Sequence, residues 1–372
     1  MDYLLEQVLN GLALGAIYAF IALGYTMVYG IIKLINFAHG EFFMVGAFAG
    51  WMVLTLAGLD MVGLPWPVPM LLAFAVAMGV AGLAAAVLAV VTERLAYKPL
   101  RGASRIAALL TALGVSLFLQ NMGIQVFTAE QKAFPDARQF VPMAQLDSYA
   151  GTAFDGSAYV LFEVEKVTGG LEEVREVVAF AGEPLDIDKV RALSGRSWRG
   201  APVPGFFVDR PLGVTSRKVL ILVSLGLSFA VLWLVVHKTQ LGRAMRAVSS
   251  NAEAARLMGI RVDFVISATF FIGAALAGVG GVIWGIRYGK LEPFMGFMPG
   301  LKAFIAAVLG GIGSLPGAVL GGLMLGLLEV LVPAYLPGGL TGYKDAVAFV
   351  VLILILLVKP SGLLGAAEGE KV

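Results

Sequence analysis

Long runs of apolar residues, separated by shorter polar segments, dominate the chain. A helix needs roughly 17–25 apolar residues to cross about 30 Å of hydrocarbon at about 1.5 Å per residue. Helices are the expected form, because lipid offers no partner to unpaired backbone polar groups. The pattern predicts an all-α polytopic membrane protein with about eight or nine transmembrane helices or re-entrant segments, at residues 5–29, 40–58, 68–92, 106–128, 218–237, 262–286, 297–312, 316–332 and 343–358.

Composition supports this class. Of 372 residues, 59% are hydrophobic and 14% are charged, whereas soluble chains carry about 45–50% and about 25%. The absence of cysteine excludes disulfides and thiolate metal sites. His39 and His237 lie far apart, so we expect no histidine-rich metal site and no cofactor. No nucleic-acid partner is expected either.

A polar segment interrupts the apolar pattern. Residues 130–217 hold 13 of the 25 acidic and 10 of the 27 basic residues, a net charge of −3. They are predicted to form a soluble insert, either a small folded cap or a partly disordered loop, with a strand over 159–167 and a short helix over 186–193. The chain then divides into an N-terminal membrane half (1–129), the insert (130–217) and a C-terminal membrane half (218–372).

Basic residues set the expected orientation. The positive-inside rule places loops rich in Lys and Arg in the cytoplasm. Alternating spans then put the N-terminus and the insert outside and the C-terminus inside. The basic groups follow the third, the fifth and the last spans, at Arg94, Lys98, Arg101 and Arg105, at His237, Lys238, Arg243 and Arg246, and at Lys359.

One cytoplasmic loop carries helix signals of its own. Ser250-Asn-Ala-Glu253 has the form of a capping box, in which the serine and the glutamate side chains pair with each other's backbone amides. Gly259 stands where a left-handed C-terminal cap is expected. These signals predict a coupling helix at about 250–259, about eight residues and about 12 Å long. On these signals alone it could equally be a surface connector between two spans.

The spacing in this loop resembles a known motif. Glu253-Ala-Ala-x-x-x-Gly259 is similar to the EAA loop of ABC-importer permeases, which docks on the ATPase subunit. The resemblance implies that Glu253, Ala254, Ala255 and Gly259 contact the ATPase, with Arg256 beside them. Ser250, the expected cap, begins the predicted coupling loop.

Two further stretches narrow the resemblance. Residues 25–43 and the glycine-rich residues 310–321 are similar to signatures of the LivH-type permeases for branched-chain amino acids. The likeness covers about 5–130 and 215–365, and the insert is longer than is usual in that family. It implies a bacterial inner-membrane permease for amino acids. The implied partners are a homologous second permease, two ABC ATPase subunits, an external solute-binding protein and the lipid bilayer.

Several polar and glycine positions in these stretches are candidates for a translocation pathway. Asn36, His39 and Glu41 flank the second span, where polar groups are costly unless paired or wetted. They mark a pathway, an internal hydrogen-bond network, or the interfacial end of a helix. Breaks in the helix pattern at Gly311, Gly313, Ser314 and Gly317 indicate a pore wall, a re-entrant segment or a tight cytoplasmic turn.

Charged residues near span ends have a simpler interpretation. Glu329 is expected to snorkel to the membrane interface, with solute recognition as the alternative. Small residues at four-residue spacing, such as Gly11 with Gly15 and Gly322 with Gly326, predict close helix packing.

The chain is not expected to be an enzyme or to bind ATP. It contains no Gly-Lys-Ser or Gly-Lys-Thr phosphate loop, so the energy would come from a partner. A self-sufficient secondary transporter or channel, for a small polar solute such as urea or a short amide, is the alternative. It would need charged residues inside the membrane to couple an ion.

Overall fold

The computed structural model describes residues 2–33, 36–56, 68–134 and 216–335, four strands within 141–203, and short stretches between 346 and 365. Seven described helices are long and apolar enough to cross a membrane, as the sequence predicts. They are α1 (Asp2–Ile32), α2 (His39–Leu56), α3 (Val68–Thr92), α4 (Arg105–Phe127), α7 (Ser216–Lys238), α10 (Val262–Tyr288) and α12 (Leu315–Tyr335). The predicted span at 343–358 lies largely outside the described residues.

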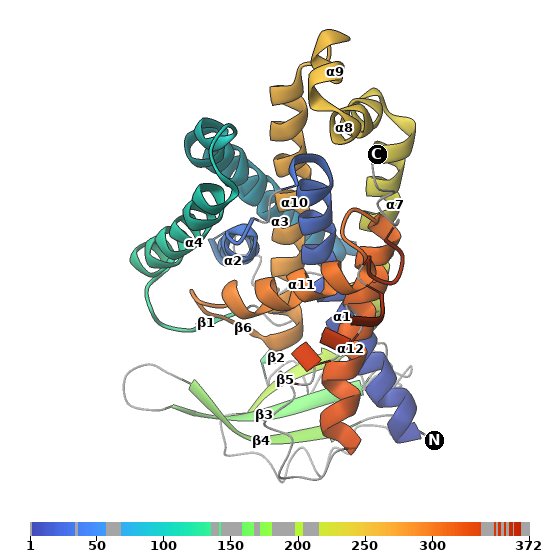
Figure 1. Cartoon of the computed structure of the whole chain (residues 1–372). Coiled ribbons are helices and arrows are strands. Elements are labelled where there is room, and N and C mark those ends of the chain that lie inside the picture. Colours follow the sequence, from blue (N-terminus) through green and yellow to red (C-terminus); the bar gives the residue numbers. More distant parts are fainter. Residues whose placement is uncertain are drawn as a thin grey trace.

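Helix α1 forms the centre of the helical body (Figure 1). It packs against α10, α12 and α11 (Phe297–Gly310), and 94% of its most apolar window is buried, compared with 17% for α7. A Cβ placed on Gly326 would lie 2.1 Å from the Gly15 nitrogen. Glycines therefore let α1 and α12 touch along their backbones, which confirms the predicted packing role.

The segment 297–335 forms two helices joined by a turn. Helix α11 has 14 residues, about 21 Å at 1.5 Å per residue, which is too short to cross about 30 Å of hydrocarbon alone. The turn uses Gly311 and Gly313, at φ +102° and +96°. Residues 361–365 pack on this turn, where the Leu363 and Leu364 amides donate to the carbonyls of Leu309 and Gly310.

The insert begins beside the end of α10. Strand β1 (Lys132–Ala133) pairs antiparallel with β6 (Lys290–Leu291), and the Phe134 amide donates to the Gly289 carbonyl at 2.9 Å. The insert is therefore attached at the end of α10 opposite Val262.

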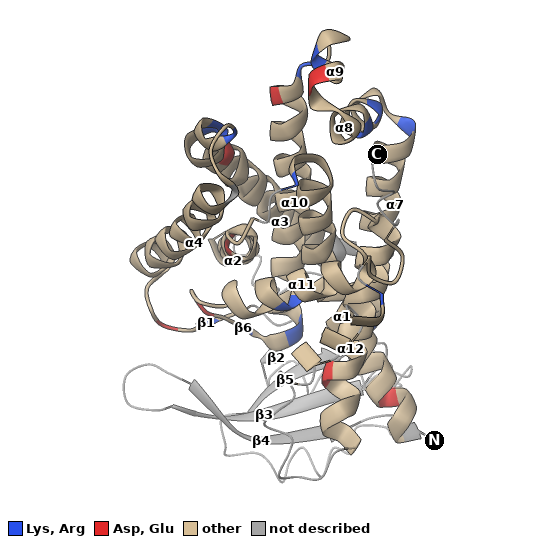
Figure 2. Cartoon of the chain, viewed as in Figure 1, with Lys and Arg blue, Asp and Glu red and all other residues tan. Residues whose placement is uncertain are grey.

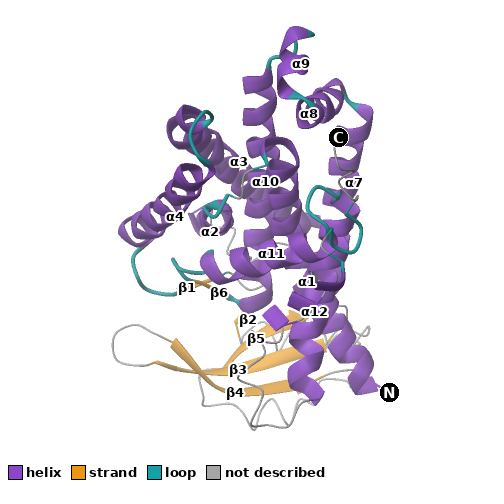
Figure 3. Cartoon of the chain, viewed as in Figure 1, coloured by secondary structure: helices purple, strands orange, loops and turns teal. Residues whose placement is uncertain are grey.

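Four strands within the insert form one antiparallel sheet in the order β2-β5-β3-β4 (Figure 3). The strand predicted over 159–167 is confirmed, with a register irregularity between Glu163 and Val164 where it pairs with its neighbour. The helix predicted over 186–193 lies outside the described residues. The strands are β2 (Val141–Pro142), β3 (Ala158–Lys166), β4 (Glu172–Phe180) and β5 (Trp198–Val203).

Candidate functional site

Helices α8 (Gln240–Ser250) and α9 (Ala252–Leu257) project from the helical body beside the beginning of α10 (Figure 1). The Thr239 hydroxyl caps α8 by accepting a hydrogen bond from the Gly242 amide at 3.1 Å. Helix α8 turns one face inward through Gly242, Met245 and Val248, the three-residue spacing of an amphipathic helix. Its buried face anchors the two short helices to the body.

Asn251, and not Ser250, caps α9. The Asn251 side-chain oxygen accepts from the amides of Glu253 and Ala254, each at 3.0 Å. Ser250 is the last residue of α8, so the predicted capping box with Glu253 is wrong. The physical reason is that Asn251 takes the extended conformation that an N-cap needs, φ −156° and ψ 106°, whereas Ser250 is still helical.

Gly259 ends α9 as predicted. Its φ is +82°, a left-handed conformation that costs other L-residues about 1–2 kcal/mol. The Gly259 amide donates to Arg256 and the Ile260 amide to the Ala255 carbonyl, both at 3.0 Å. This pair of bonds is the Schellman motif. The helix is six residues long, shorter than predicted, because α8 extends through Ser250.

The surface of α9 divides into two sides. Glu253, Ala254 and Arg256 are exposed, as is Gly259, whereas Ala255 is 4% exposed and packs against its own chain. The sequence interpretation missed Leu257 and Met258, which are 89% and 83% exposed. These two neighbouring exposed apolar side chains make the end of α9 a candidate docking surface.

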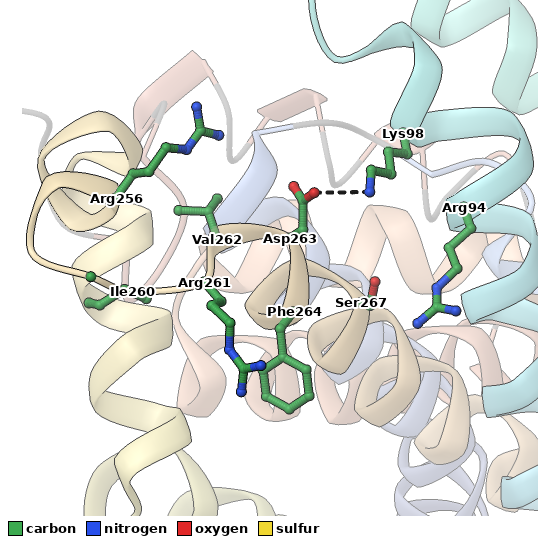
Figure 4. A pocket seen from close by; sticks show the side chains of 10 residues that line it. Arg94, Lys98, Arg256, Ile260, Arg261, Val262, Asp263, Phe264 and Ser267 are labelled. Atoms are coloured by element: carbon green, nitrogen blue, oxygen red, sulfur yellow. Dashed lines mark ion pairs between the residues drawn. The ribbon is translucent and has the colours of Figure 1, made fainter.

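A pocket of about 910 Å³ lies between α9, the beginning of α10 and the end of α3 (Figure 4). Figure 2 shows charged residues gathered at this end of the molecule. Among the described residues that line the pocket, four are basic and one is acidic, a net charge of +3. They are Arg94, Lys98, Arg256, Arg261 and Asp263. The pocket therefore suits an acidic partner surface.

Ion pairs join the segment that follows α3, residues 93–101, to α10 beside this pocket. Arg101 bridges Glu93, which is fully buried, and Asp263. Lys98 Nζ lies 2.9 Å from Asp263 Oδ2, the ion pair drawn in Figure 4. Ser267 of α10 donates to the other Glu93 oxygen at 2.7 Å. Glu93 begins a π-helical turn, Glu93–Tyr97, which aims its carboxylate at α10.

Asn36 and His39 lie inside the protein, each 1% exposed. The Tyr97 hydroxyl donates to the Asn36 side-chain oxygen at 2.7 Å. His39 packs against Tyr25, with ring centroids 4.7 Å apart. A Cβ on Gly24 would lie 2.1 Å from His39 Nε2. These residues lie between helices in the interior of the protein.

Glu41 belongs to a second internal network. It is fully buried, and its Oε1 accepts from Ser116 at 3.0 Å and from Gln120 at 2.8 Å, both on α4. Its Oε2, like His39 Nε2, has no hydrogen-bond partner among the described residues. The network ties α2 to α4 and leaves polar atoms facing inward. A role for Asn36, His39 and Glu41 in translocation stays a prediction.

The glycine-rich turn lines a separate cavity. Gly313 and Ser314 face a space of about 510 Å³ together with Thr26, Gly30 and Ser249.

The same turn is held by local contacts. The Ser314 hydroxyl accepts a hydrogen bond from the Gly317 amide at 3.2 Å, at the beginning of α12, and Gly317 packs on Gly310. Gly311 instead packs on residues 361–365. The structure thus has a tight turn here, at the same end of the body as α8.

Glu329 does not snorkel. Its side chain and that of Lys302 are each 8% exposed, and Lys302 Nζ lies 2.6 Å from Glu329 Oε1. The Tyr18 hydroxyl donates to Glu329 Oε2 at 2.6 Å. The predicted interfacial position is wrong because partners on α11 and α1, distant in sequence, neutralise the carboxylate inside the helical body.

The fold and these sites define a multi-pass membrane protein with two short helices, α8 and α9, projecting from one end of its body. A family model for the branched-chain amino acid transport system / permease component matches residues 7–356. The chain belongs to this permease family.

Three relatives illustrate the likeness. The chain is 39% identical over 374 aligned positions to the high-affinity branched-chain amino acid transport system permease protein LivH of Escherichia coli K12, covering 100% of this chain and 98% of the relative. It is 38% identical over 371 positions to BraD of Pseudomonas aeruginosa, a permease of the same description, covering 99% and 98%. The ribose import permease protein RbsC of E. coli K12 is 27% identical over 264 positions, covering 66% and 80%. No solved structure matches the chain.

Proposed function

We propose that this chain is the permease subunit of an ATP-binding-cassette importer that translocates branched-chain or related amino acids. The observation that carries the proposal is the end of α9, where Leu257 and Met258 are exposed beside a pocket of net positive charge. Full-length likeness to permeases of high-affinity branched-chain amino acid transport supports the substrate class.

The partners follow from the division of labour in such an importer. Two ABC ATPase subunits dock on the α9 tips, a homologous second permease completes the channel, and an external binding protein delivers the amino acid. The chain itself has no phosphate loop. It is a non-catalytic subunit, and ATP hydrolysis belongs to the partners.

The mechanism is alternating access. Closure of the ATPases pulls α9, and the Ile260–Ala255 backbone bond links the end of α9 directly to the beginning of α10. Helix α10 packs against α1, α2 and α3, and Arg101 joins Glu93, directly after α3, to Asp263 of α10. Movement of the tip therefore shifts the central helices together. The cavity beside Gly313 and Ser314 is the inner end of the route.

The proposed orientation puts α8 and α9 in the cytoplasm of a bacterial cell and the insert outside its inner membrane. The N-terminus is then outside and the C-terminus inside. The attachment of the insert at the far end of α10 supports this arrangement. Because the chain lacks cysteine, Glu130→Cys and Ser250→Cys can each be labelled with an impermeant maleimide. Labelling from opposite faces agrees with the proposal, and labelling from one face contradicts it.

Affinity purification from native membranes tests the assembly. We expect two ATPase subunits and a second permease to purify with the wild-type chain. Gly259→Pro should lose the ATPases, because proline lacks the amide that bonds to Arg256 and cannot adopt φ +82°. Ser250→Ala, at the same tip, is the matched control and should retain them.

The same experiment separates the alternative function. A self-sufficient transporter would purify without an ATPase even after cross-linking in the membrane, and that result would replace the importer proposal. The buried Lys302–Glu329 pair is the feature that such a transporter could use for ion coupling.

A further inference from the structure

A third pocket lies at the end of α10 farthest from α9. Its volume is about 390 Å³, within the range of about 300–1,000 Å³ usual for small-molecule sites. Helix α10 contributes Trp284 and Tyr288, and α11 contributes Met298 and Lys302. The mouth is formed by residues 290–295, next to the point where the insert is attached.

The floor of this pocket is charged. Lys302 and Glu329 form an ion pair at 2.6 Å, and the Lys302 ammonium also lies 6.0 Å from the centre of the Tyr18 ring. A buried ion pair is weak evidence for stability, because desolvation offsets most of its attraction. Ionisable side chains inside a membrane protein more often mark the path of a solute. The pair therefore calls for a functional explanation.

The mouth repeats the arrangement of the floor. Lys290 Nζ lies 2.9 Å from Glu292 Oε1, with the two side chains 53% and 40% exposed. The pocket thus holds two cationic and two anionic side chains, a net charge of zero, with one pair near water and the other buried. A ligand with a net charge would leave an unbalanced charge in this low-dielectric space. A zwitterion can exchange partners with either pair and leave the balance unchanged.

The remaining wall is apolar. Trp284, Met295 and Met298 line it together with Phe294. Methionine adapts its shape to different hydrocarbon groups, so the wall suits branched aliphatic side chains of several shapes. Charge and shape together suit an α-amino acid with an apolar side chain.

We propose that this pocket is a transient binding site for the zwitterionic amino acid within the permease, entered after release from the binding protein. Lys302 binds the α-carboxylate, Glu329 binds the α-ammonium group, and the aliphatic side chain lies against Trp284 and Met298. This inference rests on the proposed function and adds a substrate site to it. Lys290 and Glu292 guide the zwitterion into the mouth.

Cysteine protection in native membrane vesicles tests the site. Met298→Cys is placed in the cysteine-free chain of the complete complex and labelled with an impermeant methanethiosulfonate. With a Kd of about 1 mM, L-leucine at about 10 mM would occupy roughly nine-tenths of the sites and slow labelling about tenfold. Leucinamide lacks the carboxylate and 4-methylpentanoate lacks the ammonium group, so neither should protect. Tyr3→Cys, exposed on α1 away from the pocket, is the control and should react at one rate throughout.

A paired variant separates recognition from structure. Lys302→Met with Glu329→Gln removes both charges together, in the chain that also carries Met298→Cys, and assembly is checked by co-purification of the partners. We expect leucine to lose its protection of the introduced thiol in the assembled variant. A purely structural pair would leave the protection intact, and that result would overturn the proposal.

Three further outcomes of the cysteine-protection experiment would overturn the proposed site, and a fourth would contradict the proposed function. Equal labelling with and without leucine, in vesicles that import leucine, would overturn the site and leave the importer function standing. Protection by 4-methylpentanoate as strong as by leucine would overturn zwitterion recognition. If neither Met298→Cys nor Tyr288→Cys reacts, the pocket is closed to the outside and the proposal is wrong. Vesicles without leucine import or ATPase partners would instead contradict the proposed function.

Discussion

The pocket beside α9 and the pocket beside Trp284 lie at opposite ends of the same helix, α10. Their linings differ in net charge. The α9 pocket holds an excess of three positive charges and opens beside exposed Leu257 and Met258. The Trp284 pocket balances each cation with an anion. Water screens unpaired charge at the first end, so it remains available for a protein partner. The apolar interior tolerates charge at the second only in pairs.

The largest expected effect comes from unbalancing the buried pair. Glu329→Gln removes the carboxylate that neutralises Lys302, and breaking a buried pair in this way costs about 3–5 kcal/mol. We expect a lower unfolding temperature of the purified protein in detergent, and less folded protein recovered from membranes. The double variant Lys302→Met/Glu329→Gln should recover most of this stability. A single variant as stable as wild type would show that the pair is not desolvated.

At the α9 end, we expect a smaller effect, on the affinity for the ATPase, and no effect on the stability of the fold. Leu257→Ser with Met258→Ser removes the apolar tip, and burying one such side chain stabilises a complex by about 1.5–3 kcal/mol. ATPase affinity should therefore fall at least about 10–100-fold, measured by titrating purified ATPase onto the permease in nanodiscs. The unfolding temperature should not change, because both side chains are exposed. Unchanged affinity would place the ATPase elsewhere.

The sequence predicted the helices better than their contacts. Runs at 106–128 and 262–286 agree closely with α4 and α10, because the length of an apolar run is visible in the sequence. The sequence does not predict the Lys302–Glu329 ion pair, because its two residues lie on different helices. Nor does it predict the hydrogen bond from Tyr18 to Glu329, which joins residues 311 positions apart. Glu329 was instead expected to snorkel, because it lies close to the end of its span.

Helices α8 and α9 show what a sequence does not reveal about a short exposed segment. The sequence located the loop and its glycine stop, because Gly259 is required by a local backbone conformation. The sequence analysis does not single out Leu257 and Met258, since a sequence does not tell which side of a short helix is exposed. The cap was misplaced by one residue, because serine and asparagine are about equally good N-caps and only the end of α8 decides between Ser250 and Asn251.

The smallest expected effect is on local exchange in α9, and it tests whether Asn251 or Ser250 caps this helix. Asn251→Ala removes the oxygen that accepts from the Glu253 and Ala254 amides, a loss of about 0.5–2 kcal/mol for an N-cap. Because α9 is short and exposed, the loss should appear as faster hydrogen–deuterium exchange of these two amides, while exchange in α10 stays unchanged. Ser250→Ala should leave both rates as in wild type. Faster exchange in Ser250→Ala with none in Asn251→Ala would restore the original capping box and reassign the beginning of the coupling helix.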